Sequence, residues 1–142
     1  MIREYRAADL ERVLDVWYRA SVVAHSFLPE GFFAAERELL RDRWLPNSET
    51  TVFVADDEVV GFLSLVGNEV GGLFVDPDHQ RRGIGRALMD RAQESRPSLE
   101  LSVFAANSDG LAFYRAYGFE VVGRQTNEET GHPELRLRLS PD

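Results

Sequence analysis

The chain of 142 residues carries 24 acidic against 16 basic side chains, a formal net charge of −8, and no cysteine. A chain of this length can bury roughly two thirds of its unfolded surface, so we expect one folded domain. The acidic balance argues against nucleic acid as the main partner, because phosphate backbones are bound by clustered Lys and Arg. The absence of cysteine excludes disulfides, thiolate metal sites and a cysteine nucleophile.

Two features of the chain argue against a membrane partner. No apolar run approaches the roughly 20 residues of a transmembrane helix. The first residues, Met1–Arg6, carry charges where a signal peptide needs an apolar stretch. We therefore expect a cytoplasmic protein.

Hydrophobic periodicity predicts an α/β chain, with a mixed, mostly antiparallel sheet of about seven strands flanked by about four helices. Helices are expected over Asp9–Ala24, Pro29–Trp44, Ile84–Arg96 and from Asn107 to a glycine terminator at Gly118. Strands are expected over Ile2–Arg6, Thr51–Ala55, Val59–Val66, Glu69–Val75, Leu99–Phe104, Glu120–Gln125 and Glu134–Leu139. The loop Asp56-Asp57-Glu58 and the tight turn Gly67-Asn68 predict an antiparallel meander of three strands.

A glycine-containing segment between a strand and a helix is the strongest chemical signal. It reads Gln80-Arg81-Arg82-Gly83-Ile84-Gly85 and leads into Arg86. Glycines at a helix start let backbone N–H groups approach a ligand closely, and the helix dipole favours an anion there. The arginines add positive charge, so we expect a pyrophosphate site. A dinucleotide fingerprint is the main rival, but it needs Gly or Ala where this chain has Leu88.

The segment Gln-x-x-Gly-x-Gly after Val-Asp-Pro resembles the acyl-CoA-binding motif of the GNAT N-acetyltransferase superfamily. A second stretch, Asn107–Phe119, resembles the family's later motif: an Asn that opens a helix, a Tyr seven residues on, and a closing Gly-Phe. The pattern, with Ala24-His25-Ser26-Phe27, looks like the small bacterial YjaB-like subgroup. The resemblance implies a single N-acetyltransferase domain over residues 1–142, with acetyl-CoA as co-substrate and no metal.

The resemblance also implies the reaction and its acceptor classes. Acetyl would pass from acetyl-CoA to a primary amine by direct attack in a ternary complex. The acceptor would be a small amine or a peptide amine, and a protein lysine or N-terminal acetyltransferase is the alternative within enzymes. A toxin that acts on aminoacyl-tRNA is disfavoured by the acidic balance. A non-catalytic acyl-CoA sensor is the alternative from another class, and the resemblance allows a homodimer.

The site residues follow from the same resemblance. The cofactor arm would lie along the fourth strand where it splays from the fifth, against backbone N–H groups of Leu73, Phe74 and Val75. Adjacent glycines, Gly71-Gly72, favour a bulge there. Tyr114 would donate a proton to the leaving thiolate, and Asn107, two helical turns earlier, would hydrogen-bond the same arm. The competing interpretation of Tyr114 is an aromatic side chain that packs helix against sheet.

The base that takes the acceptor's proton is left open between Glu69, His25 and water. Glu69 lies four residues before Leu73 on the same strand and is expected to share its side-chain face. His25 ends the first helix and has an ordinary pKa better suited to neutral pH. The remaining histidines, His79 and His132, show no metal-ligand spacing with it, so no metal site is expected.

Overall fold

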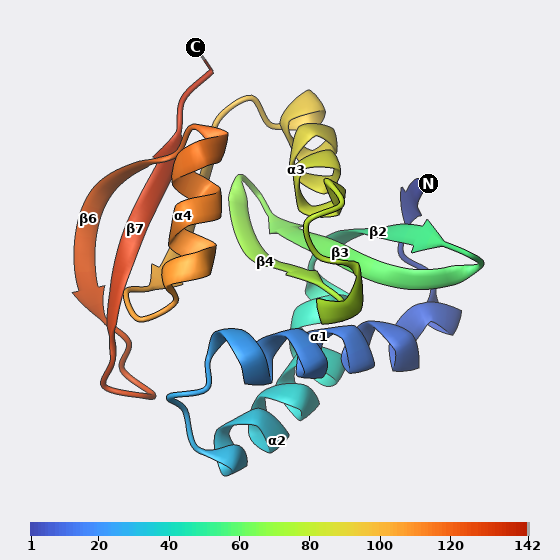
Figure 1. Cartoon of the computed structure of the whole chain (residues 1–142), viewed down its shortest axis with the longest axis horizontal. Coiled ribbons are helices and arrows are strands. Elements are labelled where there is room, and N and C mark those ends of the chain that lie inside the picture. Colours follow the sequence, from blue (N-terminus) through green and yellow to red (C-terminus); the bar gives the residue numbers. More distant parts are fainter. Residues whose placement is uncertain (142) are drawn as a thin grey trace.

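The computed structural model describes residues 1–141 and shows a seven-stranded sheet with helices on both faces (Figure 1). The strand order is β1-β2-β3-β4-β5-β7-β6, and every neighbouring pair is antiparallel except β4 with β5. The strands are β1 (Ile2–Glu4), β2 (Glu49–Ala55), β3 (Glu58–Val66), β4 (Glu69–Val75), β5 (Leu99–Phe104), β6 (Glu120–Thr126) and β7 (Pro133–Leu139). The expected mixed, mostly antiparallel sheet is confirmed.

The four expected helices are α1 (Leu10–Ala24), α2 (Glu30–Leu39), α3 (Ile84–Ser95) and α4 (Ser108–Tyr117). The prediction of one regular helix over Pro29–Trp44 was wrong beyond Leu39. There the chain widens into a π-helical turn, η2 (Leu40–Trp44), and then tightens into a 3-10 turn, η3 (Leu45–Asn47). Pro46 has no N–H to continue the α-helical hydrogen bonds. The side chain of Asn47 instead donates to the Arg43 carbonyl at 2.7 Å.

The first strand is also shorter than expected. It ends at Glu4 instead of Arg6 because the chain turns there into a short 3-10 segment, η1 (Ala7–Asp9). The Arg6 N–H donates to the Asp9 carboxylate at 2.8 Å, and Arg3 pairs with the same carboxylate through two hydrogen bonds of 2.8 Å. These bonds hold the main chain of Arg6 in the turn and not in the strand.

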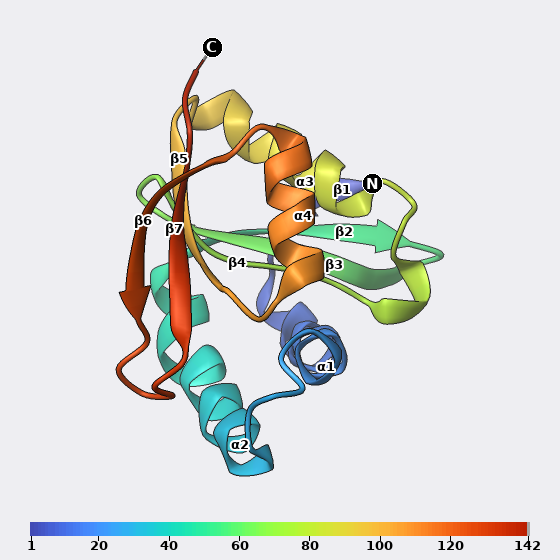
Figure 2. The same cartoon turned by 60° about the vertical axis from the view of Figure 1, so that its left-hand side comes forward.

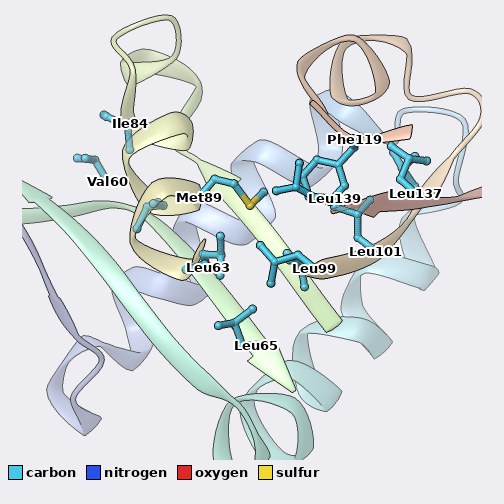
Figure 3. Close-up of a cluster of buried hydrophobic side chains, with 14 residues drawn as sticks. Val60, Leu63, Leu65, Ile84, Met89, Leu99, Leu101, Phe119, Leu137 and Leu139 are labelled. Carbon is cyan, nitrogen blue, oxygen red and sulfur yellow. The ribbon is translucent and has the colours of Figure 1, made fainter. Parts of the chain in front are cut away.

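Two hydrophobic cores lie on opposite faces of the sheet. The alternation of side chains along β3 supplies both, since Phe62 packs with α1 and α2 while Leu63 packs with α3. The core under α1 and α2 contains Val13, Val16, Trp17, Leu28, Phe33, Leu45, Val52, Val59 and Phe62. The core under α3 and α4 includes Val60, Leu63, Leu65, Ile84, Met89, Leu99, Leu101, Phe119, Leu137 and Leu139 (Figure 3).

The sheet opens between its fourth and fifth strands. β4 and β5 pair at a single position, Glu69 with Glu100, and then run in different directions (Figure 2). α1 contacts β3 and β4 below this opening, and α4 contacts β5 beside it. The fold therefore leaves a gap in main-chain pairing at the centre of the sheet, next to the start of α3.

Candidate active site

A cleft of about 1270 Å³ occupies the opening between β4 and β5. Three walls line it. The first is formed by α1 and α2, and the second by β4 and the start of α3. The third is formed by β5, α4 and the loop between β6 and β7. Lining side chains include Trp17, Ser21, His25, Phe32, Glu36, Leu73, Phe74, Phe104, Asn107, Tyr114 and Glu129. Residues from the whole length of the described chain therefore meet in one elongated space.

A bulge at Gly71 gives β4 its outward turn. Leu65 pairs with Val70, but the next residue, Ser64, pairs with Gly72, which leaves Gly71 as the extra residue. The predicted bulge is thus present where adjacent glycines weaken the strand ladder. A Cβ on Gly72 would lie 2.7 Å from the Phe74 ring, so this glycine also makes room for that ring in the cleft.

The same bulge corrects the predicted position of Glu69. Val70 and Leu73 both pack in the α3 core although they are three residues apart, because the extra residue shifts the alternation by one. Glu69 therefore lies on the opposite face from Leu73, toward α1 and α2. The expectation that the two share a face was wrong.

Two backbone amides of β4 point into the opening. The Asp76 N–H donates to the Val60 carbonyl at 2.8 Å, which fixes the phase of the ladder with β3. Alternation along an antiparallel pair then directs the main-chain groups of Phe74 toward β3, and those of Leu73 and Val75 toward the cleft. Of the three predicted donors, Leu73 and Val75 have the right direction, and Phe74 contributes its ring.

The predicted pyrophosphate segment forms a turn in front of α3. Arg81 has φ 65° and Gly83 has φ 78°, and no side chain caps the helix that begins at Ile84. The first helical hydrogen bond runs from the Ala87 N–H to the Gly83 carbonyl at 3.0 Å. The N–H groups of the first turn, including that of Gly85, have no helical partner and can bind an anion.

The three arginines of this segment differ in position. All three are exposed, and none forms an ion pair with another residue between 1 and 141. Arg81 and Arg86 line the cleft, whereas Arg82 does not. The Arg86 guanidinium lies 5.6 Å from the centre of the Tyr117 ring. Positive charge without a protein counterion beside an uncapped helix start suits a phosphate ligand.

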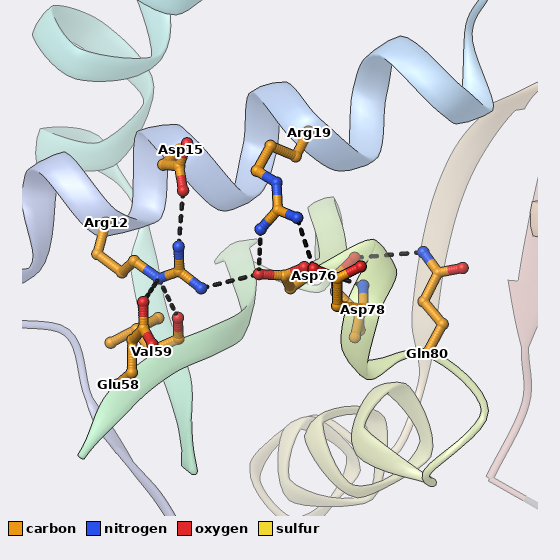
Figure 4. A network of polar contacts seen from close by, with 9 residues as sticks. Arg12, Asp15, Arg19, Glu58, Val59, Asp76, Asp78 and Gln80 are labelled. Atoms are coloured by element: carbon orange, nitrogen blue, oxygen red, sulfur yellow. Dashed lines mark hydrogen bonds and ion pairs between the residues drawn. The ribbon is translucent and has the colours of Figure 1, made fainter. Parts of the chain in front are cut away.

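An ion-pair network centred on a buried carboxylate, that of Asp76, holds this turn against α1 (Figure 4). Asp76 follows β4 and is only 1% exposed. One carboxylate oxygen accepts hydrogen bonds from Arg12 at 2.8 Å and Arg19 at 2.6 Å, and the other accepts from the Asp78 N–H at 3.0 Å. Gln80 donates to the Val75 carbonyl at 3.2 Å, so the last residues of β4 and the start of the loop are joined.

Replacement of Asp76 by Asn should destabilise the protein by roughly 2–4 kcal/mol, because two guanidinium groups lose their buried counterion. Desolvation raises the pKa of Asp76, but hydrogen bonds from Asp78 and Arg12 and the charges of both arginines outweigh it and lower the pKa. A lowered carboxyl pKa contributes stability above about pH 4 that is lost on further acidification. Urea unfolding of both proteins from pH 3 to 7 measures this.

The matched control is Asp78→Asn, which removes the exposed partner of Arg19. Its carboxylate is 74% exposed and accepts one hydrogen bond of 2.8 Å, so the expected loss is below about 1 kcal/mol. Equal losses in the two variants would contradict the structural role given to Asp76.

Tyr114 lies on the cleft side of α4. Its ring packs against Phe113 and Phe119, with centroids 5.4 and 5.6 Å apart. Its hydroxyl forms no hydrogen bond within residues 1–141, and burial raises the pKa of Tyr114 to about 12. The phenol is therefore protonated at neutral pH and free to donate into the cleft.

Asn107 opens α4 as predicted, and the cap uses part of its side chain. Its Oδ1 accepts from the Gly110 N–H at 3.0 Å. A Cβ on Gly110 would lie 2.5 Å from Asn107 Nδ2, so the glycine is needed for this arrangement. The Nδ2 group donates to no acceptor within residues 1–141, so it is the part of Asn107 that can contact a ligand in the cleft.

The two candidate bases differ in their surroundings. His25 caps the end of α1, and its ring contacts Phe104 and Phe27 at centroid distances of 5.1 and 6.0 Å. Burial lowers the pKa of His25, so its imidazole is neutral at pH 7. Glu69 accepts two hydrogen bonds from Arg136, at 2.7 and 3.0 Å. Both of its carboxylate oxygens are thus already bound to a guanidinium.

Residues 48–121 match a family described as the acetyltransferase (GNAT) domain. The chain is 34% identical over 134 residues to the peptidyl-lysine N-acetyltransferase YiaC of Escherichia coli. The matched region covers 94% of this chain and 92% of that protein. This chain belongs to the GNAT acetyltransferase family. It is 36% identical over 139 residues to the peptidyl-lysine N-acetyltransferase YjaB of Salmonella typhimurium, and the matched region covers 97% of this chain and 95% of that protein.

The solution structure of apo YjaB from Escherichia coli has the same fold, with a TM-score of 0.87 at 32% identity over 97% of this chain and 95% of that one. The similarity to the YjaB-like subgroup is confirmed. As a GNAT protein the chain is an acetyl-CoA-dependent N-acetyltransferase.

Two features are absent from residues 1–141. No helix in this range has the length and apolar character of a membrane span. The same residues contain no group of three or more His, Asp or Glu side chains arranged to hold a metal ion.

Sequence reasoning did not find several residues that shape this acetyltransferase's cleft. Arg12 and Arg19 are seven residues apart, two helical turns on one face, and that spacing could have marked a shared partner. Arg136 and Glu129 carry no comparable local signal. Their roles depend on β7 and the preceding loop lying beside the cleft.

Proposed function

We propose that this protein is a single N-acetyltransferase domain over residues 1–142 that transfers acetyl from acetyl-CoA to the side-chain amine of lysine in peptides or proteins. The assignment of acetyl-CoA as the donor is supported by the cleft, which contains both the unpaired amides of β4 and the uncapped start of α3. The acceptor half is supported by the names of the two relatives, both peptidyl-lysine N-acetyltransferases. Other primary amines are the broader class.

In this proposal the donor lies along β4. The first turn of α3 binds the pyrophosphate, with positive charge from Arg81 and Arg86. The N–H groups of Leu73 and Val75 donate hydrogen bonds to the pantetheine arm and to the oxyanion that forms on the acetyl carbonyl. The amine attacks the thioester carbon directly in a ternary complex, and the sulfur leaves as a thiolate. Tyr114 donates its proton to that thiolate.

His25 is the preferred base for the acceptor ammonium, and Glu69 is its competitor. In the His25→Ala variant we expect a rate loss of roughly a hundred-fold near neutral pH, which shrinks as pH rises and the amine deprotonates unaided. Because the pKa of His25 is lowered, the wild-type enzyme should lose base catalysis by the neutral imidazole only when the pH falls below the ordinary pKa of histidine. Glu69→Gln should show a smaller loss, since Arg136 occupies its carboxylate.

The measurement is kcat/KM from pH 6 to 10 with a working acceptor and saturating acetyl-CoA. Melting curves of both variants show whether the fold is retained. If neither variant has a pH-dependent loss, solvent takes the proton and neither residue is the base.

The function is tested by incubating the protein with acetyl-CoA and lysine peptides, polyamines, amino acids and peptides with a free N-terminus. All 16 basic residues of the chain are arginines, so the enzyme contains no lysine of its own. Acetyl-lysine detected by mass spectrometry therefore comes from the acceptor. We expect CoA release with lysine peptides above the rate without acceptor. No release with any amine would overturn the proposed activity.

A further inference from the structure

Two carboxyl groups from separate elements lie close together in the cleft. Glu36 projects from α2 and is half-buried, and Glu129 belongs to the loop between β6 and β7. Desolvation, the negative charge of Glu129 and a hydrogen bond with its carboxyl together raise the pKa of Glu36 to about 7. Neither carboxylate forms an ion pair with a residue between 1 and 141, in contrast to Glu69 and its arginine.

The wall that α2 and η2 form around Glu36 is apolar. Phe32, Glu36, Leu40 and Trp44 follow one another at four-residue spacing and all line the cleft. The loop that carries Glu129 packs against the connection between α1 and α2, since the rings of His132 and Phe27 lie 4.9 Å apart. The carboxyl pair therefore has aromatic and aliphatic side chains of the same cleft beside it.

A buried hydroxyl gives an independent sign of a polar ligand in this cleft. Ser21 lies on α1, is 1% exposed and lines the cleft, yet its Oγ has no hydrogen-bond partner. An unpaired buried hydroxyl costs free energy, so such groups in folded proteins are normally bonded. A polar group of an acceptor in the cleft would supply the missing partner.

We propose that Glu36 and Glu129 form the subsite that binds the protonated amine of the acceptor, while the apolar side chains of α2 and η2 hold its methylene chain. This rests on the proposed function and refines its acceptor class. A cation between two carboxylates relieves their mutual repulsion and replaces the proton that they otherwise share. The subsite favours an alkyl ammonium such as a lysine side chain. It disfavours free amino acids, whose α-carboxylate would meet two negative charges.

The kinetic test compares Glu36→Gln and Glu129→Gln with the wild-type enzyme, using Nα-acetyl-lysine methylamide as acceptor at saturating acetyl-CoA. Each variant should raise KM for this probe at least ten-fold with a smaller change in kcat. The double variant should lose less than the two single losses combined, since the carboxyls act as a unit. Unchanged KM in both single variants would overturn the subsite. Turnover by the wild-type enzyme would still uphold the proposed function in that case, so the two failures can be told apart.

Two neighbouring residues provide matched controls. Glu38→Gln on α2 and Glu128→Gln in the loop remove the same charge from exposed positions that do not line the cleft. Both controls should keep the wild-type KM. A ten-fold rise in the controls as well would show a general loss of negative charge and would also overturn the subsite.

A binding test decides the question without turnover. With CoA present at pH 7, the ¹³C signal of the Glu36 carboxyl should move to its ionised position when Nα-acetyl-lysine methylamide is added. Nα-acetyl-norleucine methylamide, which lacks the ammonium, should leave the signal in place. No response to the lysine probe would exclude the subsite even if the wild-type protein acetylated no acceptor and the proposed function failed separately.

Discussion

The Tyr114→Phe variant should turn over roughly ten- to a thousand-fold more slowly than the wild-type enzyme, with nearly unchanged affinity for CoA. The substitution removes the one group on α4 that can protonate a leaving thiolate in the cleft, and it keeps the ring that packs against Phe113 and Phe119. Because burial raises the pKa of Tyr114 to about 12, its ionisation should not limit the rate at pH 7 to 10. Steady-state kinetics and the CoA-induced melting shift measure both expectations.

Tyr117→Phe is the matched control for this variant. Tyr117 is on the same helix, but its hydroxyl donates to Asp90 at 2.6 Å and lies 2.9 Å from the Gln93 side chain, outside the cleft. Its loss should lower stability by about 1–2 kcal/mol and leave turnover normal. A Tyr114→Phe enzyme that unfolds, or that works at the wild-type rate, would instead support a packing role for Tyr114.

Local backbone chemistry explains why much of the fold could be predicted from the sequence. Gly67 adopts φ 60° in the predicted β3–β4 turn, and Gly83 adopts φ 78° at the predicted start of α3. Gly71 forms the predicted bulge. Glycine tolerates these conformations where other residues are strained, so its position alone indicates them.

The parts that could not be predicted depend on contacts between distant elements. The hydrogen bond between Arg136 and Glu69 joins residues 67 positions apart, and the bond between Arg19 and Asp76 joins residues 57 positions apart. Charge patterns in a single sequence do not reveal which of many Arg and Asp or Glu side chains the fold will pair. The altered face of Glu69 has another cause: alternation was assumed across a bulge that itself reverses it.

The two ends of the proposed site differ in how far a sequence can predict them. The donor end follows from motifs, because backbone amides and a helix start bind phosphate whatever the neighbouring side chains are. The proposed acceptor site is built from side chains of α1, α2 and the loop between β6 and β7, including Glu36 and Glu129. Their significance appears only when the two carboxyls are seen on opposite walls of one cleft.

Gly83→Val should abolish the stabilisation of the protein by acetyl-CoA. At a ligand concentration of about 100 times Kd, binding adds about 2.7 kcal/mol to the native state, which corresponds to a rise of roughly 5–10 °C in the melting temperature. A side chain at Gly83 would stand in open space in front of α3, where an anion must approach the first-turn amides. The wild-type protein should show the rise with acetyl-CoA and CoA, and much less with NAD or ATP.

Gly67→Val separates loss of binding from loss of stability. Gly67 also has a positive φ, 60°, and open space around its Cβ position, but it lies in the β3–β4 turn and does not line the cleft. Both variants should lose about 1–2 kcal/mol or more of stability, because a branched residue is strained at positive φ. Only Gly83→Val should lose the acetyl-CoA shift. A full shift in Gly83→Val, or an equal shift with NAD in the wild-type protein, would place the donor's phosphates elsewhere than at the start of α3.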